Sequence, residues 1–454
     1  MSRNEPSTPT KRDFFWIISP TAGSTDPASL VGPLPPFTLK GRTRSTSACT
    51  ISRDSVCLQI PTGSGDEAKT LFLDEGYTGL SDALQDIPPI GRGQQGAVYF
   101  AHVVNKDNST TPVVIKKMES SAATAESVKI HFELTKALHS SSAAENILFC
   151  IHTEIQLEST FVILPFCTIF AKSVIEKSLL CGDPILRDAV AAQITQDIIV
   201  ALHFMHTFQR EDGGIGYVHR DLKPDNIALK KSGDFWHAVL CDFDSAAKKG
   251  APNAGSAGAI AYQHPLCSVG EDAPQATPEN DLYQLGITLF QLLGENDYVK
   301  ERLHPPQGYN FHNAYQWKEA QYIAAKAHRD QLRNTDMKPD EGKALYPSLS
   351  EELKKVSSTY AKLKTVALHL TRCFEQPNIE EVVDALSTIR REFIAQHGIE
   401  TIVPKLNYFY ESLESNKAAS PVASPTSSSL FRRYPRADLN SKGTTTTAPE
   451  FGFR

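Results

Sequence analysis

The sequence lacks the features of a secreted or membrane-spanning protein. None of its 8 cysteines forms a C-x-x-C pair, and no apolar run approaches the roughly 18 residues that a membrane helix needs. The apolar cluster at residues 14–18 is too short for the core of a signal peptide. We therefore expect reduced thiols, no membrane span, and a cytoplasmic or nuclear location.

An excess of basic residues is also missing. Lys and Arg total 46 against 52 for Asp and Glu, which gives a net charge of −6. A nucleic-acid-binding surface needs a basic face, so nucleic acid is not an expected partner. The 454 residues are enough for one large domain or two to three smaller ones. A hydrophobic content of 41% is slightly low for a globular chain and predicts unstructured ends.

Composition divides the chain into four predicted parts. The two ends are rich in Ser, Thr and Pro without apolar periodicity, which is typical of disorder. The parts are a disordered extension over 1–50, a lead-in with a candidate hairpin over 51–84, a folded domain over 85–396, and a C-terminal extension over 397–454 that is disordered from about residue 412.

Within the folded domain, short apolar runs that predict β-strands come first and long helical stripes follow. The runs lie at 97–100, 113–115, 147–151 and 161–164, and the stripes at 190–202, 282–292, 363–373 and 379–393. This order predicts an α+β fold with two lobes. A small β-rich N-terminal lobe is expected over 85–167 and a larger helical C-terminal lobe over 168–396, with a cleft between them.

Three glycines, Gly91, Gly93 and Gly96, form the pattern G-x-G-x-x-G. In a dinucleotide-binding fold this pattern opens a helix, but here it leads into the strand-like residues 97–104. We therefore interpret it as a glycine turn between two strands, whose backbone N–H groups are able to lie over phosphates. An ordinary hairpin turn is the alternative.

Lys116 ends an apolar strand and is a candidate for neutralising nucleotide phosphates. The alternative is an edge-strand lysine in water. A buried lysine needs a carboxylate partner. Glu133, in the helix-forming stretch 130–138, is the preferred partner, and Glu126 is the competing candidate.

The strongest signal is the complete pattern H-R-D-L-x-x-x-N at residues 219–226. Here the chain resembles the eukaryotic protein kinases of the serine/threonine type, and the resemblance covers nearly all of 85–396. It implies that Asp221 orients the attacking hydroxyl and that Lys223 offsets charge on the transferred phosphoryl group. It also implies that Asn226, with Asp242 from the following D-F-D sequence, binds Mg²⁺.

The resemblance extends to the nucleotide-binding residues. The glycine turn and Lys116, held by Glu133, are expected to bind the phosphates of ATP. Val98 would close over the adenine, and Pro165 and Cys167 would bind it through backbone groups at the hinge. Asp281 resembles the helix aspartate that braces the family's catalytic loop, which corresponds to residues 219–226 here.

The chain also departs from the family. Asp244 stands in place of the glycine of D-F-G, and the family's A-P-E sequence is His264-Pro265-Leu266 here. The threonine of Gly-Thr-x-x-Tyr is replaced by Ala259. These changes affect the segment that positions a peptide substrate.

Two functions follow from these patterns. The first is transfer of the gamma-phosphoryl group of ATP, with Mg²⁺, to a Ser or Thr hydroxyl of a protein. The alternative is a nucleotide-binding pseudokinase that acts as a scaffold through protein contacts, which the altered segment favours. The presence of Lys116, Asp221, Asn226 and Asp242 favours the enzyme. A small-molecule kinase of related fold is disfavoured by the Leu-Lys-Pro sequence at 222–224.

Overall fold

The structure is a computed structural model with defined placement for ten stretches of the chain. Both predicted disordered ends lie outside these stretches, apart from residues up to 418. The described residues are 56–61, 68–73, 79–93, 96–105, 108–137, 145–251, 258–265, 276–303, 314–334 and 346–418.

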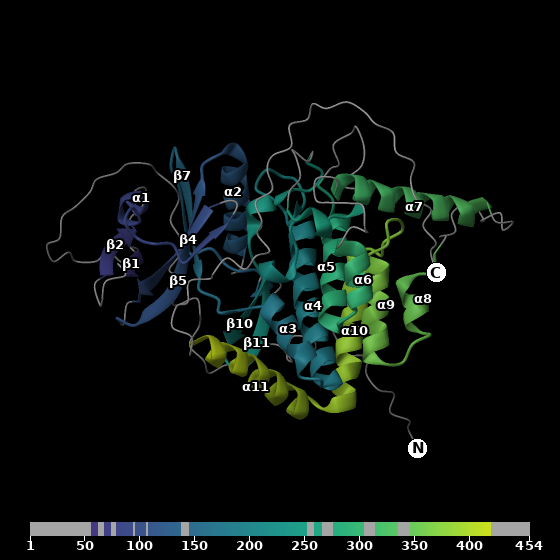
Figure 1. The fold of residues 1–454 in the computed structure, drawn as a ribbon. Coiled ribbons are helices and arrows are strands. Elements are labelled where there is room, and N and C mark those ends of the chain that lie inside the picture. The colour runs from purple at the N-terminus through teal and green to yellow at the C-terminus, as the bar shows by residue number, and fades with distance from the viewer. Residues whose placement is uncertain are drawn as a thin grey trace, which may run out of the picture.

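The N-terminal lobe is a seven-stranded antiparallel sheet with one main helix, α2, beside it (Figure 1). The strand order is β2-β1-β4-β5-β7-β6, and β3 pairs with β4. The hairpin of β1 and β2 lies where the sequence suggested one, and it extends the edge of the sheet. The elements are β1 (Val56–Pro61), β2 (Ala68–Leu73), α1 (Leu80–Ala83), β3 (Gly91–Gly93), β4 (Gly96–Val104), β5 (Thr110–Glu119), α2 (Ala122–Lys136), β6 (His152–Ile155) and β7 (Ser159–Pro165).

One expected strand is absent. The run 147–151 was predicted to be β-type, but only Ile147 forms an isolated bridge, to Leu240, and β6 begins at His152. Ile147, Leu148 and Cys150 are nonetheless buried. Ile147 and Leu148 pack against β11 (Phe235–Leu240), whereas Cys150 packs with Met118 and Val128. Their apolar character therefore reflects core packing, because burial alone does not distinguish a strand from a core loop.

The C-terminal lobe is built from helices around two short sheets (Figure 1). Together the two lobes confirm the predicted α+β, two-lobed fold. The elements, besides β11, are β8 (Ile169–Phe170), α3 (Ala171–Leu180), α4 (Pro184–Thr207), β9 (Tyr217–Val218), η5 (Pro224–Asn226), β10 (Ile227–Ser232), η6 (Phe243–Ser245), β12 (Ala247–Lys248), η7 (Ile260–Tyr262), α5 (Pro278–Leu293), α6 (Asn296–Leu303), α7 (Ala314–Asn334), α8 (Leu349–Leu353), α9 (Thr359–Leu370), α10 (Ile379–His397) and α11 (Ile399–Ala418).

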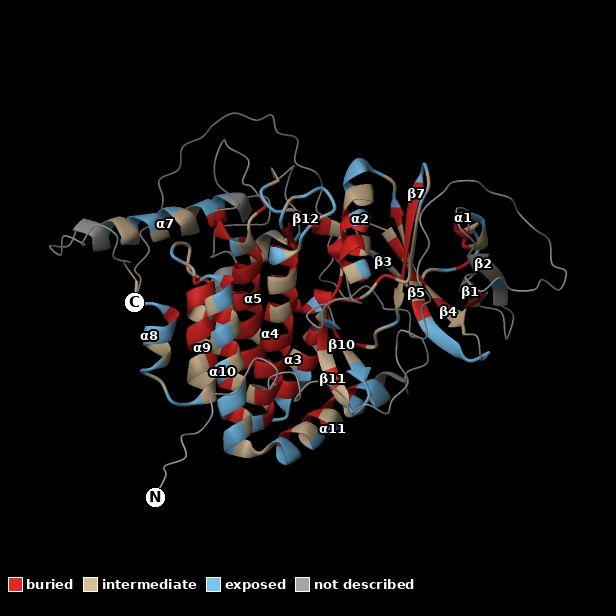
Figure 2. Cartoon of the chain, turned by 180° about the vertical axis from the view of Figure 1, so that it is seen from behind, coloured by how far each residue is buried: buried red, intermediate tan, exposed pale blue. Residues whose placement is uncertain are grey.

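Helices α4 and α5 form the centre of this lobe, and Figure 2 shows both as mostly buried. The apolar stripes predicted at 190–202 and 282–292 lie on them, and those at 363–373 and 379–393 fall on α9 and α10, although α9 ends before Cys373. Asp183 begins α4 by accepting hydrogen bonds from the N–H groups of Ile185 and Leu186. Among the described residues, no helix has the length and apolar character to cross a bilayer.

The C-terminal extension is ordered further than predicted. Disorder was expected from about residue 412, but α11 continues to Ala418 and lies along the lower edge of the lobe (Figure 1). The cause is an apolar stripe with helical spacing that crosses residue 412 and is buried against the C-terminal lobe. Its members are Ile402, Leu406, Phe409, Tyr410 and Leu413.

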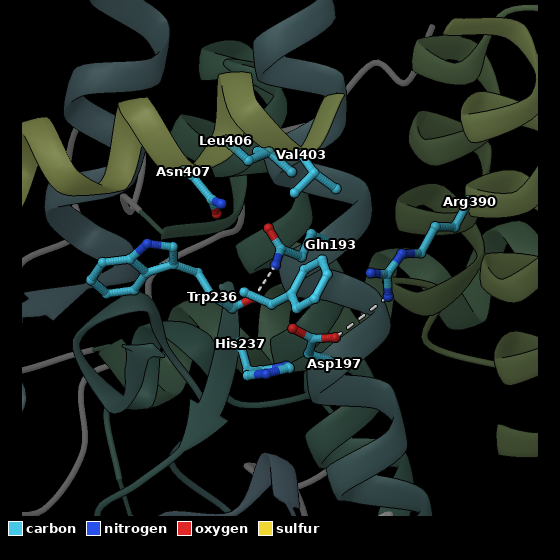
Figure 3. A pocket seen from close by; sticks show the side chains of 9 residues that line it. Gln193, Asp197, Trp236, His237, Arg390, Val403, Leu406 and Asn407 are labelled. Carbon is cyan, nitrogen blue, oxygen red and sulfur yellow. Dashed lines mark hydrogen bonds and ion pairs between the residues drawn. The ribbon is translucent and has the colours of Figure 1, made fainter. Parts of the chain in front are cut away.

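Helix α11 covers a pocket between α4, β11 and α10 (Figure 3). Asp197 is buried in it, accepts a hydrogen bond from the N–H of Ala238 at 2.9 Å, and lies 3.6 Å from Arg390. His237 also lines the pocket, and Tyr410 lies close to Asp197. Burial raises the pKa of Asp197 to about 6, and Arg390 and the Ala238 N–H oppose this shift only in part.

Replacing Asp197 with asparagine should remove a pH dependence of stability. The pKa of Asp197 in the folded state, about 6, lies above its ordinary value of 3.8. The carboxyl group therefore favours folding below pH 4, and this contribution of about 3 kcal/mol is lost as pH rises through 6. Urea titrations at pH 4 and pH 7 should show the variant gaining about that much relative to the wild type. The exposed Asp384→Asn is the control. Parallel pH profiles for wild type and Asp197→Asn would contradict this expectation.

Candidate active site

Lys116 and Val98 occupy paired positions on β5 and β4, so their side chains share one face of the N-terminal sheet. Alternation along β5 explains this placement. Val113 and Ile115 pack into the cluster on the opposite face, whereas Met118 packs with Val128 of α2 on the same face as Lys116. The lysine is thus directed toward α2 and the boundary between the lobes.

The three glycines lie in the hairpin of β3 and β4, as predicted. Gly91 pairs with Val98, and Gly93 pairs with Gly96, so the motif does not open a helix. Gly96 has a packing reason to be glycine, because a Cβ atom there would lie 2.0 Å from the backbone oxygen of Lys117. Whether the turn binds phosphates stays a prediction.

Gly96→Ala should weaken the N-terminal lobe, because β4 would have to move away from β5. We expect a loss of about 2 kcal/mol in the free energy of unfolding, typical of overpacking. Gly91→Ala is a matched control, since a Cβ there has no neighbour within 4 Å. Thermal unfolding of both variants measures the difference. Equal stability would show that the strand pair accommodates the extra methyl group.

Asp221 is held by three donors from the catalytic loop and the segment that follows it. Its Oδ2 accepts hydrogen bonds from Lys223 Nζ at 2.7 Å and Asn226 Nδ2 at 3.0 Å. Its Oδ1 accepts one from the N–H of Ala259 at 2.8 Å. These bonds fix the orientation of a carboxylate that is 8% exposed. The residues predicted to be catalytic, Asp221 and Lys223, are therefore in direct contact.

The catalytic loop is anchored from below by helix α5. Asp281 is fully buried and accepts hydrogen bonds from the N–H groups of His219 (2.8 Å) and Arg220 (2.7 Å), and from His206 Nε2 (2.9 Å). Gln284 accepts from the N–H of Leu222 and donates to the oxygen of Arg220. Asp281 was expected in this position; Gln284 was not, because a buried glutamine has no distinguishing pattern.

Asn226 and Asp242 have the chemistry that a magnesium ion requires. Asn226 Nδ2 donates to the backbone oxygen and to Oδ2 of Asp221, so its carbonyl oxygen is left as the donor atom for a cation. Asp242 supplies a carboxylate that is 35% exposed. In the described part of the chain, no group of three or more His, Cys, Asp or Glu side chains forms a complete metal site. The donor set of Asn226 and Asp242 suits Mg²⁺, which usually takes one or two carboxylates together with substrate phosphates.

Lys116 contacts two carboxylates, and neither is the predicted one. Its Nζ lies 2.6 Å from Asp242 Oδ1 and 2.5 Å from Asp244 Oδ2. The expected ion pair with Glu133 is not formed: Glu133 accepts a hydrogen bond from Tyr217 and lies 3.9 Å from Lys129. Lys116, Asp242 and the catalytic loop therefore meet as predicted, but Glu133 does not join them.

The rotation of α2 about its axis explains why Glu133 does not contact Lys116. His131 stacks on the ring of Phe243, with the ring centroids 4.4 Å apart, and Phe243 also meets His219 edge to face. Successive helix residues are 100° apart, so Glu133 lies about 200° around the helix from His131. Neither the spacing of Lys116 and Glu133 nor the helical pattern indicated that a histidine would set this rotation.

The charges at this point depend on one another. Burial opposes the charged form of Lys116, but Asp242 and Asp244 together raise the pKa of Lys116. Burial also disfavours ionised Asp242, but Lys116 holds the pKa of this carboxyl group below its ordinary value. Burial and the neighbouring Asp242 raise the pKa of Asp244 to about 6, against the effect of Lys116. Two acidic groups around one ammonium make a site that favours a further cation.

The predicted hinge residues follow β7. The carbonyl of Pro165 and the Sγ atom of Cys167 lie 3.9 Å apart. Cys167, with Leu164, packs on a buried cluster of Leu148, Ala228, Val239 and Cys241 from the two sides of the boundary. Burial raises the pKa of the Cys167 thiol to about 11, which favours the protonated thiol at neutral pH. Adenine binding at the hinge stays a prediction.

Comparison with known proteins gives a consistent result. Residues 84–371 match the family described as protein kinase domain. The serine/threonine-protein kinase UCNL of Arabidopsis thaliana is 27% identical over 166 residues, which are 36% of this chain and 38% of that protein. The serine/threonine-protein kinase SULU of Caenorhabditis elegans is 29% identical over 212 residues, which are 46% of this chain and 19% of that protein. The chain thus spans less than two fifths of the length of these relatives.

Proposed function

Because more than half of its residues match the protein kinase domain, the chain belongs to the protein kinase family, and from this premise we propose that it is a serine/threonine protein kinase. It would transfer the gamma-phosphoryl group of ATP to a Ser or Thr hydroxyl of a protein substrate. The observation that carries the proposal is the contact between Lys116 and Asp242, which joins the lysine of the N-terminal lobe to the predicted metal ligand of the C-terminal lobe.

Positioning supplies most of the catalysis in this proposal. The hairpin of Gly91, Gly93 and Gly96, together with Lys116, binds the phosphates, and Val98, Pro165 and Cys167 surround the adenine. Asn226 and Asp242 would hold Mg²⁺, which when bound neutralises the triphosphate. Glu133 is no longer needed as the partner of Lys116, because Asp242 and Asp244 occupy that position.

Asp221 orients the acceptor hydroxyl and accepts its proton. The hydrogen bonds from Lys223 and from the Ala259 N–H aim the carboxylate before the substrate arrives. Lys223 Nζ, 2.7 Å from Asp221, then lies beside the phosphoryl group as negative charge grows on it. Lysine at this position supports a Ser or Thr acceptor rather than Tyr. We also propose that the kinase acts in the cytoplasm or nucleus, which the buried, unbridged thiols of Cys150 and Cys241 support.

The direct test measures transfer of label from gamma-labelled ATP to Ser- and Thr-containing peptides. Lys116→Met should lower transfer about a hundredfold while the chain stays folded, because it removes one cationic contact to the phosphates. Circular dichroism checks the fold of the variant. Activity equal to the wild type would refute the role of Lys116. If the wild type binds nucleotide but transfers no phosphate, the pseudokinase scaffold becomes the supported function and the enzyme does not.

A further inference from the structure

The two carboxylates at Lys116 are not equivalent. Asp242 is 35% exposed and is the expected ligand of Mg²⁺, whereas Asp244 is only 14% exposed. A metal ion at Asp242 would compete with the Lys116 ammonium for this carboxylate, whose Oδ1 already contacts Lys116. A site that loads a metal therefore needs a second carboxylate to keep Lys116 in position.

Helix α2 does not supply that carboxylate. Glu126 is 3.3 Å from Lys248, and Glu133 is bound by Tyr217. The helix face that meets Phe243 carries His131 and, one turn earlier, Ser127. Ser127 is buried, and its hydroxyl donates to the backbone oxygen of Thr124, so this face presents no charge to Lys116.

The turn that carries Asp244 is held firmly. Asp242 has a left-handed backbone, with φ 66°, and leads into the single turn η6. The N–H of Ala246 closes this turn on the oxygen of Phe243 at 2.9 Å, and the Phe243 ring is fixed between two histidine rings. Asp244 therefore projects its carboxylate from a rigid turn. The glycine found at this position in the family has no carboxylate to offer.

We propose that Asp244 is the positioning residue for Lys116: it keeps the ammonium aimed at the nucleotide phosphates when Asp242 turns to the metal, and so replaces a carboxylate on α2. This inference rests on the proposed function, since it names the anchor of the phosphate-binding lysine. In this proposal Asp244 acts through Lys116 and touches neither the reacting atoms nor the metal.

A double-mutant cycle tests the inference through binding. Dissociation constants of a fluorescent ATP analogue with Mg²⁺ are measured for the wild type, Asp244→Asn, Lys116→Met and the double variant. Asp244→Asn should weaken binding about tenfold, and should change it less than twofold when Lys116 is already methionine. The exposed Asp234→Asn is the control and should bind like the wild type.

A second experiment removes the carboxylate of Asp244 and introduces one on α2. Ser127→Glu in the Asp244→Asn background should restore binding to within about threefold of the wild type, whereas Ser127→Gln should not. Thermal unfolding identifies variants that fold. If the glutamate variant does not fold, the double-mutant cycle alone decides.

The outcomes separate this inference from the proposed function. An equal loss of nucleotide affinity from Asp244→Asn in the presence and absence of Lys116 would overturn the inference. It would indicate that Asp244 is a direct metal or nucleotide ligand. A folded Ser127→Glu variant in the Asp244→Asn background that regains no nucleotide affinity would also overturn the inference. If the wild type binds nucleotide but transfers no phosphate, the kinase proposal fails while the binding cycle still tests the Asp244 anchor.

Discussion

Asp221→Asn is expected to lower the rate of phosphoryl transfer about a thousandfold, in the range typical for the loss of a general base. Asparagine keeps the size of the side chain and one acceptor oxygen. It cannot accept the proton of the attacking hydroxyl, and its amide nitrogen would face a donor, Lys223 Nζ or the Ala259 N–H. Steady-state transfer assays at saturating ATP measure the change in kcat.

Nucleotide binding is the control for this variant. Asp221 has no hydrogen bond or ion pair with Lys116 or Asp242, and Asn226 keeps its bond to the backbone oxygen of residue 221 in the variant. The dissociation constant for the fluorescent ATP analogue should therefore change less than about threefold. A variant that retains one tenth or more of wild-type kcat would show that Asp221 is not the catalytic base.

Asp281→Ala should have the largest effect on stability. It would leave the buried N–H groups of His219 and Arg220 without their acceptor and would also remove the partner of His206. Hydrogen bonds to a charged group contribute about 1.5–3 kcal/mol each, so we expect a loss of about 4 kcal/mol in the free energy of unfolding. Urea unfolding without nucleotide measures it.

A graded series makes this prediction specific to hydrogen bonding. Asp281→Asn keeps one of the two acceptor oxygens and should lower the free energy of unfolding less than Asp281→Ala does. The exposed Asp384→Asn should leave the unfolding midpoint unchanged. If Asp281→Ala unfolds at the same urea concentration as the wild type, the loop is anchored by other contacts, such as those of Gln284.

The catalytic loop was predictable from sequence because its geometry is local. Asp221 and Asn226 are five residues apart and bond to each other directly. Asp242 follows the β10–β11 hairpin, whose register places it next to this loop. The position of Lys116 follows from strand alternation, since its neighbours Val113 and Ile115 are apolar and face the core.

The partner of Lys116 was not predictable in the same way. It depends on how α2 is rotated, and this is set by the contact of His131 with Phe243, which are 112 residues apart in the chain. Glu126 and Glu133 both satisfied the requirement for a nearby acid. Asp244 departs from the family's glycine, and its contact with Lys116, which the sequence did not indicate, gives its charge a role.

The packing of α11 on the C-terminal lobe limits where the chain is cut to express the kinase domain alone. The match to the family ends at residue 371, yet α11 buries five large apolar side chains on the C-terminal lobe, and its Glu414 is 3.4 Å from Thr168, next to the hinge. Each such side chain is worth about 1.5–3 kcal/mol when buried. A recombinant fragment trimmed to the family boundary would expose Trp236 and Gln193, so cloning boundaries belong after residue 418.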